Sequence, residues 1–196
     1  STSYKIMSDR IETGTLLCAV ACTGGTVTVE NADAQNLLTV LYSLKEMGCK
    51  ISINRDKIKL KAPEKLNPVS VETQPYPGFP TDMQPIIGAI LTKAKGKSIV
   101  TENIFENRFK YSEELVRMGA KIKQKDKTLE IVGVDKMHGE IVMSKDLRGG
   151  AALVIAGLMS EGKTTVENIE YILRGYENLD EKLRMLGANI KKEKVV

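Results

Sequence analysis

Two sets of polar side chains recur at fixed distances from three glycines that end apolar runs. Fourteen residues before Gly24, Gly96 and Gly162 stand Arg10, Asp82 and Arg148, and twelve residues after them stand Asn36, Arg108 and Arg174. A carboxylate can act as a general base, and the planar guanidinium of arginine binds carboxylates and phosphates through paired hydrogen bonds. Packing alone does not require polar residues at matching positions of a repeat. We therefore infer a site shared by three structural units.

The repeat predicts the elements that position these side chains. After each of the three glycines a strand-like stretch ends in Glu-Asn (TVTVEN, SIVTEN and KTTVEN), and a second glycine follows at positions 48, 119 and 187. These second glycines are 71 and then 68 residues apart, which is too far for ankyrin or tetratricopeptide repeats. We therefore expect an α/β fold with one domain, 1–196, built from units at about 1–66, 67–139 and 140–196.

Each unit is expected to form a strand, a helix, a strand, a second helix and two final strands. The first helices are apolar nearly all round and should be buried, whereas the second helices have one charged face. The predicted bounds are 14–23, 81–95 and 149–160 for the first helices and 34–47, 111–118 and 176–186 for the second. Period-2 alternation predicts hairpins of 49–54 with 57–61 and of 120–125 with 128–132. We expect the third unit to stop before its last strand, and the Pro-rich stretch 74–80 to be a rigid connector.

This arrangement places Arg10, Asp82 and Arg148 at the amino ends of the three buried helices. If those helices run parallel, three positive dipole ends face one mouth, which favours an anion. Gly149 and Gly150, directly after Arg148, would let backbone N–H groups approach such a ligand closely.

Composition narrows the class of protein. A length of 196 residues with 42% hydrophobic residues fits one domain, or at most two small ones, with a real core. The apolar runs are shorter than the ~18–20 residues of a membrane span, and the mostly polar start predicts no signal peptide. A net charge of +4, 5% aromatic residues and no tryptophan argue against nucleic-acid binding.

Three cysteines without metal-ligand spacing favour a reduced, cytoplasmic protein, with Cys18 and Cys22 in the core. The only histidine, His138, is expected in an exposed loop.

Four segments resemble the enolpyruvyl transferase family, and within it the UDP-N-acetylglucosamine 1-carboxyvinyltransferases. They are YPGFPTDMQP (76–85), TENIFENRF (101–109), DLRGGAALVIAGL (146–158) and RGYENLDEKLRMLGANI (174–190). The resemblance runs over essentially the whole chain. It implies the inside-out α/β barrel of that family, with three parallel helices in the middle. Because the family has two such domains with its active site in the cleft between them, the chain resembles the C-terminal domain. The family's Lys-Asn pair and reactive cysteine belong to the other domain, so this chain alone is expected to be inactive.

The same resemblance gives roles to three of the repeated polar residues. Asp82 would contact the sugar 3-hydroxyl and take its proton, although an N-cap or first-turn carboxylate is the simpler reading of that position. Arg148 and Arg174 would hold the carboxylate and phosphate of phosphoenolpyruvate, although each could also be an ordinary surface arginine. Thr81, beside Asp82, is interpreted as a cap.

Three further residues match positions in the family's site. Asp146 would orient a neighbouring basic group or assist breakdown of the intermediate. Arg108 would be either a ligand contact or a strut across the cleft. Ile104 matches a position whose backbone contacts the nucleotide sugar. Arg10, Glu12 and Asn36 receive no specific role.

The resemblance implies transfer of the enolpyruvyl group of phosphoenolpyruvate to the 3-hydroxyl of UDP-N-acetylglucosamine, the first committed step of peptidoglycan synthesis. Phosphate is released by addition and then elimination, and no metal or organic cofactor is implied. The implied partners are the two substrates and the N-terminal domain, without nucleic acid or membrane. Two alternatives stay open: a domain of the sister enzyme acting on 3-phosphoshikimate, and a non-catalytic binding module on the same fold.

Overall fold

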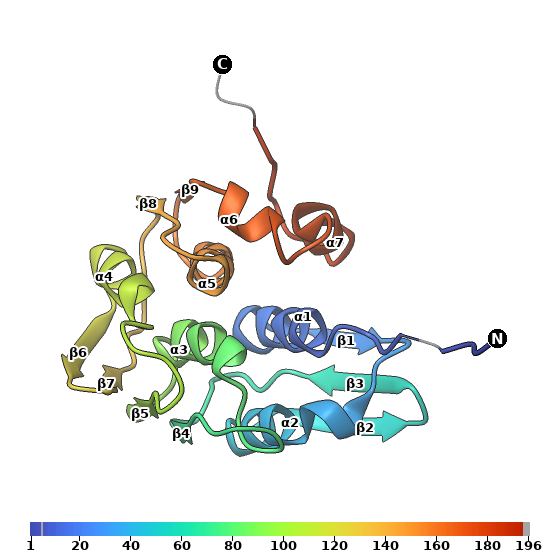
Figure 1. Cartoon of the computed structure of the whole chain (residues 1–196). Coiled ribbons are helices and arrows are strands. Elements are labelled where there is room, and N and C mark those ends of the chain that lie inside the picture. The colour runs from blue at the N-terminus through green and yellow to red at the C-terminus, as the bar shows by residue number, and fades with distance from the viewer. Residues whose placement is uncertain (5, 194–196) are drawn as a thin grey trace.

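The computed structural model describes residues 1–4 and 6–193 as alternating helices and strands (Figure 1). The helices are α1 (Arg10–Thr23), α2 (Leu38–Glu46), α3 (Gln84–Leu91), α4 (Lys110–Arg117), α5 (Leu147–Leu158), α6 (Glu170–Leu173) and α7 (Leu179–Met185), with 3-10 turns η1 (Ala34–Leu37) and η2 (Thr81–Met83). The strands are β1 (Thr26–Val29), β2 (Lys50–Asn54), β3 (Lys57–Lys61), β4 (Ser70–Glu72), β5 (Lys97–Thr101), β6 (Lys121–Lys125), β7 (Thr128–Val132), β8 (Ile141–Met143) and β9 (Thr165–Glu167). None of the described helices is long and apolar enough to cross a membrane.

Each repeat unit builds its own sheet. The second unit has the full predicted set, with strand order β4-β5-β7-β6, in which β4 and β5 are parallel and the other pairs antiparallel. The first unit has β1-β3-β2, and the third has only the parallel pair β8-β9. Each unit was predicted to have a strand before its first helix and at least one strand after its second helix, which was wrong for the first and the third unit respectively. Within residues 1–4 and 6–193, no strand precedes α1 and none follows α7.

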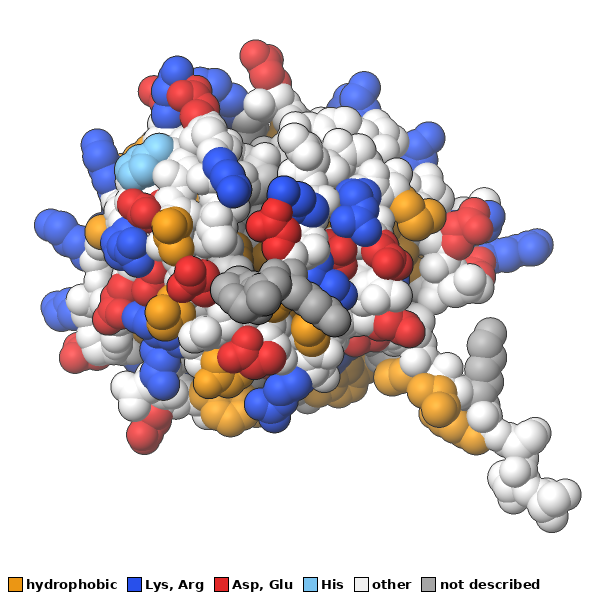
Figure 2. Space-filling view, turned by 90° about the horizontal axis from the view of Figure 1, so that it is seen from above, with side chains coloured by type: hydrophobic (Ala, Val, Ile, Leu, Met, Phe, Trp, Pro, Cys, Tyr) orange, Lys and Arg blue, Asp and Glu red, His pale blue; other side chains and the backbone are white. Residues whose placement is uncertain are grey.

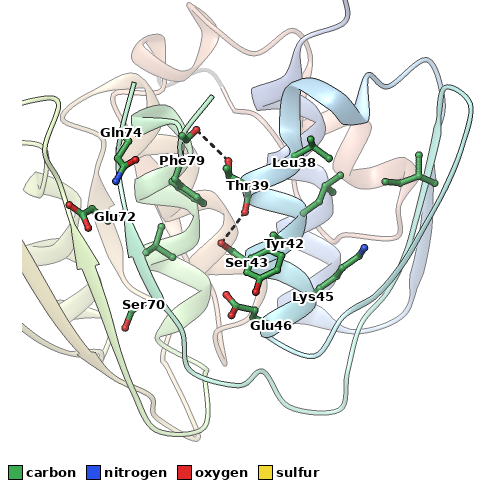
Figure 3. A pocket seen from close by; sticks show the side chains of 14 residues that line it. Leu38, Thr39, Tyr42, Ser43, Lys45, Glu46, Ser70, Glu72, Gln74 and Phe79 are labelled. Carbon is green, nitrogen blue, oxygen red and sulfur yellow. Dashed lines mark hydrogen bonds between the residues drawn. The ribbon is translucent and has the colours of Figure 1, made fainter. Parts of the chain in front are cut away.

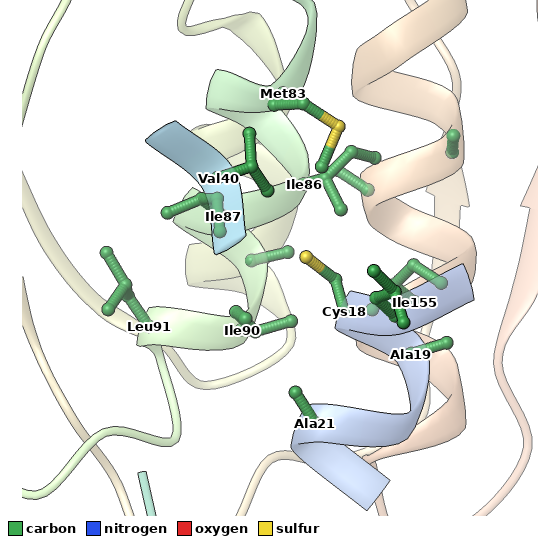
Figure 4. Close-up of a cluster of buried hydrophobic side chains, with 14 of the residues drawn as sticks. Cys18, Ala19, Ala21, Val40, Met83, Ile86, Ile87, Ile90, Leu91 and Ile155 are labelled. Carbon is green, nitrogen blue, oxygen red and sulfur yellow. The ribbon is translucent and has the colours of Figure 1, made fainter. Parts of the chain in front are cut away.

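Three helices, α1, α3 and α5, pack together in the middle of the molecule, as the absence of a polar face predicted (Figures 1 and 4). All eight residues of α3 are buried, among them Ile86, Ile87 and Ile90. Each such side chain contributes about 1.5–3 kcal/mol through removal from water. This cluster is the part of the fold that fixes how the ends of the three helices lie relative to one another.

The three helices run in the same direction. At their amino ends, Asp82 before α3 is ion-paired with Arg148 of α5. At the other ends, the hydroxyl of Thr92 contacts the sulfur of Met137, whose carbonyl accepts the backbone N–H of Glu161 just after α5. The carboxyl ends of α1 and α3 line one hollow. The expected parallel arrangement is confirmed for these helices.

The predicted ends of the buried helices needed correction. Helix α1 begins at Arg10, four residues earlier than predicted, because the side chain of Asp9 accepts the N–H groups of Ile11 and Glu12. Helix α3 ends at Leu91 rather than at 95, because the next three N–H groups donate to carbonyls three residues back in tight turns and the Lys95 N–H donates to the Leu66 carbonyl of another loop.

The amphipathic helices and hairpins also follow from the sequence. Helices α2 and α4 form where a charged face was predicted, and the hairpins β2–β3 and β6–β7 form between the predicted segments. The third amphipathic helix is shorter than predicted. It begins at Leu179 rather than 176, because Tyr176 is buried and Asn178 has a left-handed backbone.

Candidate anion-binding site at the amino ends of the buried helices

Asp82 is the centre of a three-residue ionic cluster. One carboxylate oxygen accepts Nη2 of Arg108 at 2.8 Å, and the other accepts Nη2 of Arg148 at 3.0 Å. Asp82 lies in η2 directly before α3, Arg148 is the second residue of α5, and Arg108 ends the loop before α4. The Asp82 side chain is 39% exposed, so a ligand can reach it, whereas the two arginines are mostly buried. The cluster has a net charge of +1.

Arg148 is held from behind by an aromatic ring. Its guanidinium carbon lies 5.1 Å from the ring centroid of the buried Tyr176, within the range of a cation–π contact. The Tyr176 hydroxyl lies 2.9 Å from the hydroxyl of Thr15 in α1. Burial by itself lowers the pKa of Arg148, but Tyr176 and Asp82 outweigh that effect and the net pKa is raised. All three buried helices therefore contribute to the position of this cation.

Arg108 has a similar support. Its guanidinium carbon lies 5.4 Å from the ring centroid of Phe105. Among the described residues, Nε of Arg108 and Nη1 of Arg148 are buried without an acceptor. A buried unsatisfied donor costs about 1–3 kcal/mol, and more for a charged group. An anion that accepts from these groups would offset that cost.

The backbone N–H groups that were predicted to bind an anion have other acceptors in α1 and α5. The first N–H groups of α1 and α5 already donate to the capping side chains of Asp9 and Asp146. The N–H of Gly149 donates to Asp146 Oδ1 at 2.8 Å, and the N–H of Gly150 to the Asp146 carbonyl. The two glycines are buried, and a Cβ on Gly150 would lie 2.2 Å from the Ser144 hydroxyl oxygen. Their small size therefore serves helix packing, and the side chains of the arginines provide the positive charge.

Among the described residues, Asp146, Ile104 and Arg174 have no hydrogen bond or ion pair with the side chains of this cluster. Asp146 is the N-cap of α5, which is a structural role and leaves its catalytic role a prediction. Ile104 is partly exposed, and its N–H is occupied by a bond to Glu102 Oε1 at 2.9 Å. Arg174 is exposed at the end of α6, and its side chain has no hydrogen bond or ion pair with the described residues. Their contacts with substrate likewise stay predictions.

The first unit has a counterpart of the Asp82–Arg108 pair. Arg10 Nη1 donates to the Asn36 carbonyl at 3.2 Å, and its guanidinium lies 5.6 Å from the ring centroid of Tyr76. The Tyr76 hydroxyl donates to Asn36 Oδ1 at 3.3 Å. Glu12 is ion-paired with Lys182 of α7. These residues fasten the Pro-rich connector and α7 beside α1.

Sequence reasoning overlooked Glu102. It assigned the Glu of the Glu-Asn dipeptide to the end of a repeated strand, with no further role. In the structure this side chain is buried and accepts hydrogen bonds from four donors around Asp82 and Arg108. The sequence signal was weak because the same dipeptide occurs in all three units.

The cysteines and the histidine lie where expected. Cys18 and Cys49 are buried and Cys22 is partly buried, and burial raises the pKa of Cys22 to about 12 and of Cys49 to about 11. His138 is exposed. Within the described part of the chain, no three His, Cys, Asp or Glu side chains are grouped as a metal site would require.

Two surface features are separate from the ionic cluster. A hollow of about 550 Å³ lies between α2, β4 and the Pro-rich connector, lined by Leu38, Tyr42 and Phe79 among others, and the Thr39 hydroxyl reaches the Gly78 carbonyl across it (Figure 3). None of the predicted site residues lines it. On the face drawn in Figure 2, basic and acidic side chains are interspersed rather than gathered into one basic patch.

Comparison with solved structures identifies the class. The enolpyruvyl transferase NikO from Streptomyces tendae superposes with a TM-score of 0.86 at 28% identity, over 96% of this chain and 45% of that one. An EPSP synthase from Acinetobacter baumannii superposes with a TM-score of 0.74 at 19% identity, which supports the fold alone. The fold is that of an enolpyruvyl transferase domain, as the sequence predicted.

The family follows from the sequence comparisons. The profile described as EPSP synthase (3-phosphoshikimate 1-carboxyvinyltransferase) matches residues 1–183, and the chain belongs to this family. It is 48% identical over 187 residues to a UDP-N-acetylglucosamine 1-carboxyvinyltransferase of Desulfofundulus thermocisternus, covering 95% of this chain and 77% of that protein. It is 53% identical over 190 residues to UDP-N-acetylglucosamine 1-carboxyvinyltransferase 2 of Caldanaerobacter subterraneus subsp. tengcongensis, of which it spans 46%.

Proposed function

We propose that this chain is one half of an enzyme that transfers the enolpyruvyl group of phosphoenolpyruvate to the 3-hydroxyl of UDP-N-acetylglucosamine and releases phosphate. The observation that carries the proposal is the Asp82 carboxylate held between Arg108 and Arg148 at the mouth of the buried helices. Relatives of this acceptor class are 46–53% identical to the chain, whereas the EPSP synthases superposed on it are 19% identical. The expected setting is peptidoglycan synthesis in the bacterial cytoplasm, and with it cell shape and division.

Each residue of the site has its own role in the proposed reaction. Arg148 binds the carboxylate and phosphate of phosphoenolpyruvate together with Arg174, which follows α6. When the anion takes Arg148, Asp82 keeps one of its two cationic partners, and one of its carboxylate oxygens is left free to accept a proton. Asp82 then takes the proton of the sugar hydroxyl as its oxygen adds to C2 of phosphoenolpyruvate, while C3 gains a proton. Loss of one C3 proton together with phosphate then restores the double bond of the product. Arg108 keeps Asp82 oriented, and Ile104 borders the sugar.

The rest of the site is assigned to a partner domain. The chain spans 43–46% of most of the curated relatives it matches, and closure of two domains would exclude water from the reacting groups. The test is a phosphate-release assay with phosphoenolpyruvate, run on this chain alone and mixed with a separately made N-terminal half of a relative. We expect release only in the mixture and only with UDP-N-acetylglucosamine. Release with 3-phosphoshikimate instead would assign the sister activity, and silence with both halves folded would favour a binding module.

A further inference from the structure

We propose that Glu102 is a positioning residue that holds Asp82 and Arg108 in their relative orientation. Its importance for catalysis rests on the proposed function, whereas the contacts that define it do not. Glu102 follows the last residue of β5 and is 3% exposed. It therefore lies behind the ionic cluster, out of reach of a substrate.

The carboxylate of Glu102 joins three segments of chain. Its Oε1 accepts the Thr73 hydroxyl at 2.8 Å and the backbone N–H groups of Ile104 at 2.9 Å and Phe105 at 3.1 Å. Its Oε2 accepts the Thr81 hydroxyl at 3.0 Å. Four donors and no donated hydrogen are what an ionised carboxylate can satisfy.

These segments carry the two partners of the ion pair. Thr81 directly precedes Asp82, so its bond to Glu102 fixes the backbone at the base of that side chain. The N–H of Phe105 is fixed by Glu102, and the Phe105 ring supports the guanidinium of Arg108. One buried carboxylate thus sets the approach of Asp82 and Arg108 from both sides.

The other two units show that this burial is tied to the site and not to the repeat. Glu30 stands at the same phase in the first unit, but its side chain is 59% exposed and pairs with Lys57. Glu167 in the third unit is exposed. The positions equivalent to Thr81 are Asp9 and Leu147, counting fifteen residues before the glycine, and neither offers a hydroxyl to the glutamate. Only the unit that contains Asp82 buries its glutamate, and Glu30 supplies a matched control.

The competing interpretation is that Glu102 holds the loop in place and contributes to stability alone. It predicts that changes at Glu102 lower the stability of the fold without a specific effect on turnover. A positioning role predicts that milder changes lower kcat and leave KM nearly constant, because a displaced base costs transition-state stabilisation more than binding.

The contacts are tested first, by amide hydrogen exchange on this chain. In Glu102→Ala, the Ile104 and Phe105 amides should exchange at least about tenfold faster, while the β2–β3 hairpin is unchanged. In Glu30→Ala, which removes the carboxylate at the same phase of the first unit, both amides should keep their protection. Unchanged protection in Glu102→Ala, or equal loss in both variants, would overturn the proposal. If Glu102→Ala does not fold, the orientation of Asp82 and Arg108 is tested through variants of Thr81.

The second test uses Thr81→Val and Thr81→Ser in the mixture with the N-terminal half. Thr81→Val keeps the shape but removes the donor, so kcat should fall on the order of tenfold to a hundredfold with KM nearly constant. Thr81→Ser restores the hydroxyl and should restore kcat. Equal activity of the two variants would overturn the positioning role. If the unsubstituted mixture is inactive, the proposed function fails. The contacts of Glu102 are then still decided by the exchange of the Ile104 and Phe105 amides in Glu102→Ala. If Glu102→Ala does not fold, the same exchange is measured in Thr81→Val.

Discussion

Replacing Asp82 by Asn should make this chain bind inorganic phosphate more tightly. In the structure Asp82 occupies Nη2 of both Arg108 and Arg148, so an incoming anion competes with a carboxylate that is already in place. Asparagine keeps the size of the side chain and removes its negative charge. The net charge of the cluster rises from +1 to +2, and neither arginine has to be released from an ion pair.

The size of the gain follows from distance and exposure. Two unit charges about 4 Å apart interact by about 4 kcal/mol at an effective dielectric constant near 20. Because the Asp82 side chain is 39% exposed, water and salt screen much of this. We take about 1–1.4 kcal/mol as the remaining penalty, which corresponds to a dissociation constant lowered roughly five- to tenfold.

The assay is a phosphate titration of the isotope-labelled chain followed by the NMR signals of the arginine side chains. Asp135→Asn is the matched control, since it changes the net charge equally at a side chain that is 95% exposed. The gain in Asp82→Asn should shrink at high ionic strength. Unchanged or weaker phosphate binding in Asp82→Asn, or the same gain in the control, would refute the competition between Asp82 and the anion.

Three further predictions concern stability. Asp146→Ala should lower the free energy of unfolding by about 1 kcal/mol in urea titrations, because it removes the cap of α5. Gly88→Ala should lower it by about 1–3 kcal/mol, because the added Cβ would lie 2.2 Å from the hydroxyl oxygen of the buried Tyr111. The folded-state pKa values of about 12 for Cys22 and about 11 for Cys49 are raised from 9.0. The buried neutral thiols therefore contribute their full share to the free energy of unfolding below pH 9.0, and this contribution is lost as the pH rises through 11 to 12. Thermal unfolding measured across that interval should show the loss.

Each of these has its own control. Gly14→Ala is matched to Gly88→Ala, since its Cβ would meet only the flexible end of Met83 at 2.8 Å, and equal losses would contradict the packing argument. Asp135→Asn should leave stability nearly unchanged, and a cap variant no worse than this control would contradict the role of Asp146. In Cys49→Ala the alkaline loss should become smaller. An identical pH dependence would show that other groups cause it.

The fold could be predicted from the sequence where one periodicity dominates a whole element. The stretch QPIIGAIL of α3 has no polar face, and the hairpins alternate strictly, so both were identified correctly. The ends of elements could not be predicted equally well, because they depend on particular bonds. Asp9 extends α1 by four residues, and the burial of Tyr176 delays the start of α7.

The ionic cluster could also be predicted in part, because the repeat relates the positions of its residues. The repeat predicted one shared site from two phases, that of Asp82 and Arg148 and that of Arg108, and these three residues do meet. Arg174 shares the phase of Arg108, but its side chain has no hydrogen bond or ion pair with the cluster among the described residues, and it ends α6, a helix that the sequence did not predict. The burial of Glu102 depends on long-range partners, which a repeated Glu-Asn dipeptide does not show.

The most direct test of the account is the separation of turnover from binding at Asp82. In the mixture of this chain with the N-terminal half, Asp82→Ala should lower kcat for enolpyruvyl transfer by on the order of a hundredfold to ten-thousandfold, the usual contribution of a general base. The dissociation constant for UDP-N-acetylglucosamine should change far less. An unchanged kcat, or a loss of nucleotide binding that accounts for the whole effect, would contradict the assignment of Asp82 as the base.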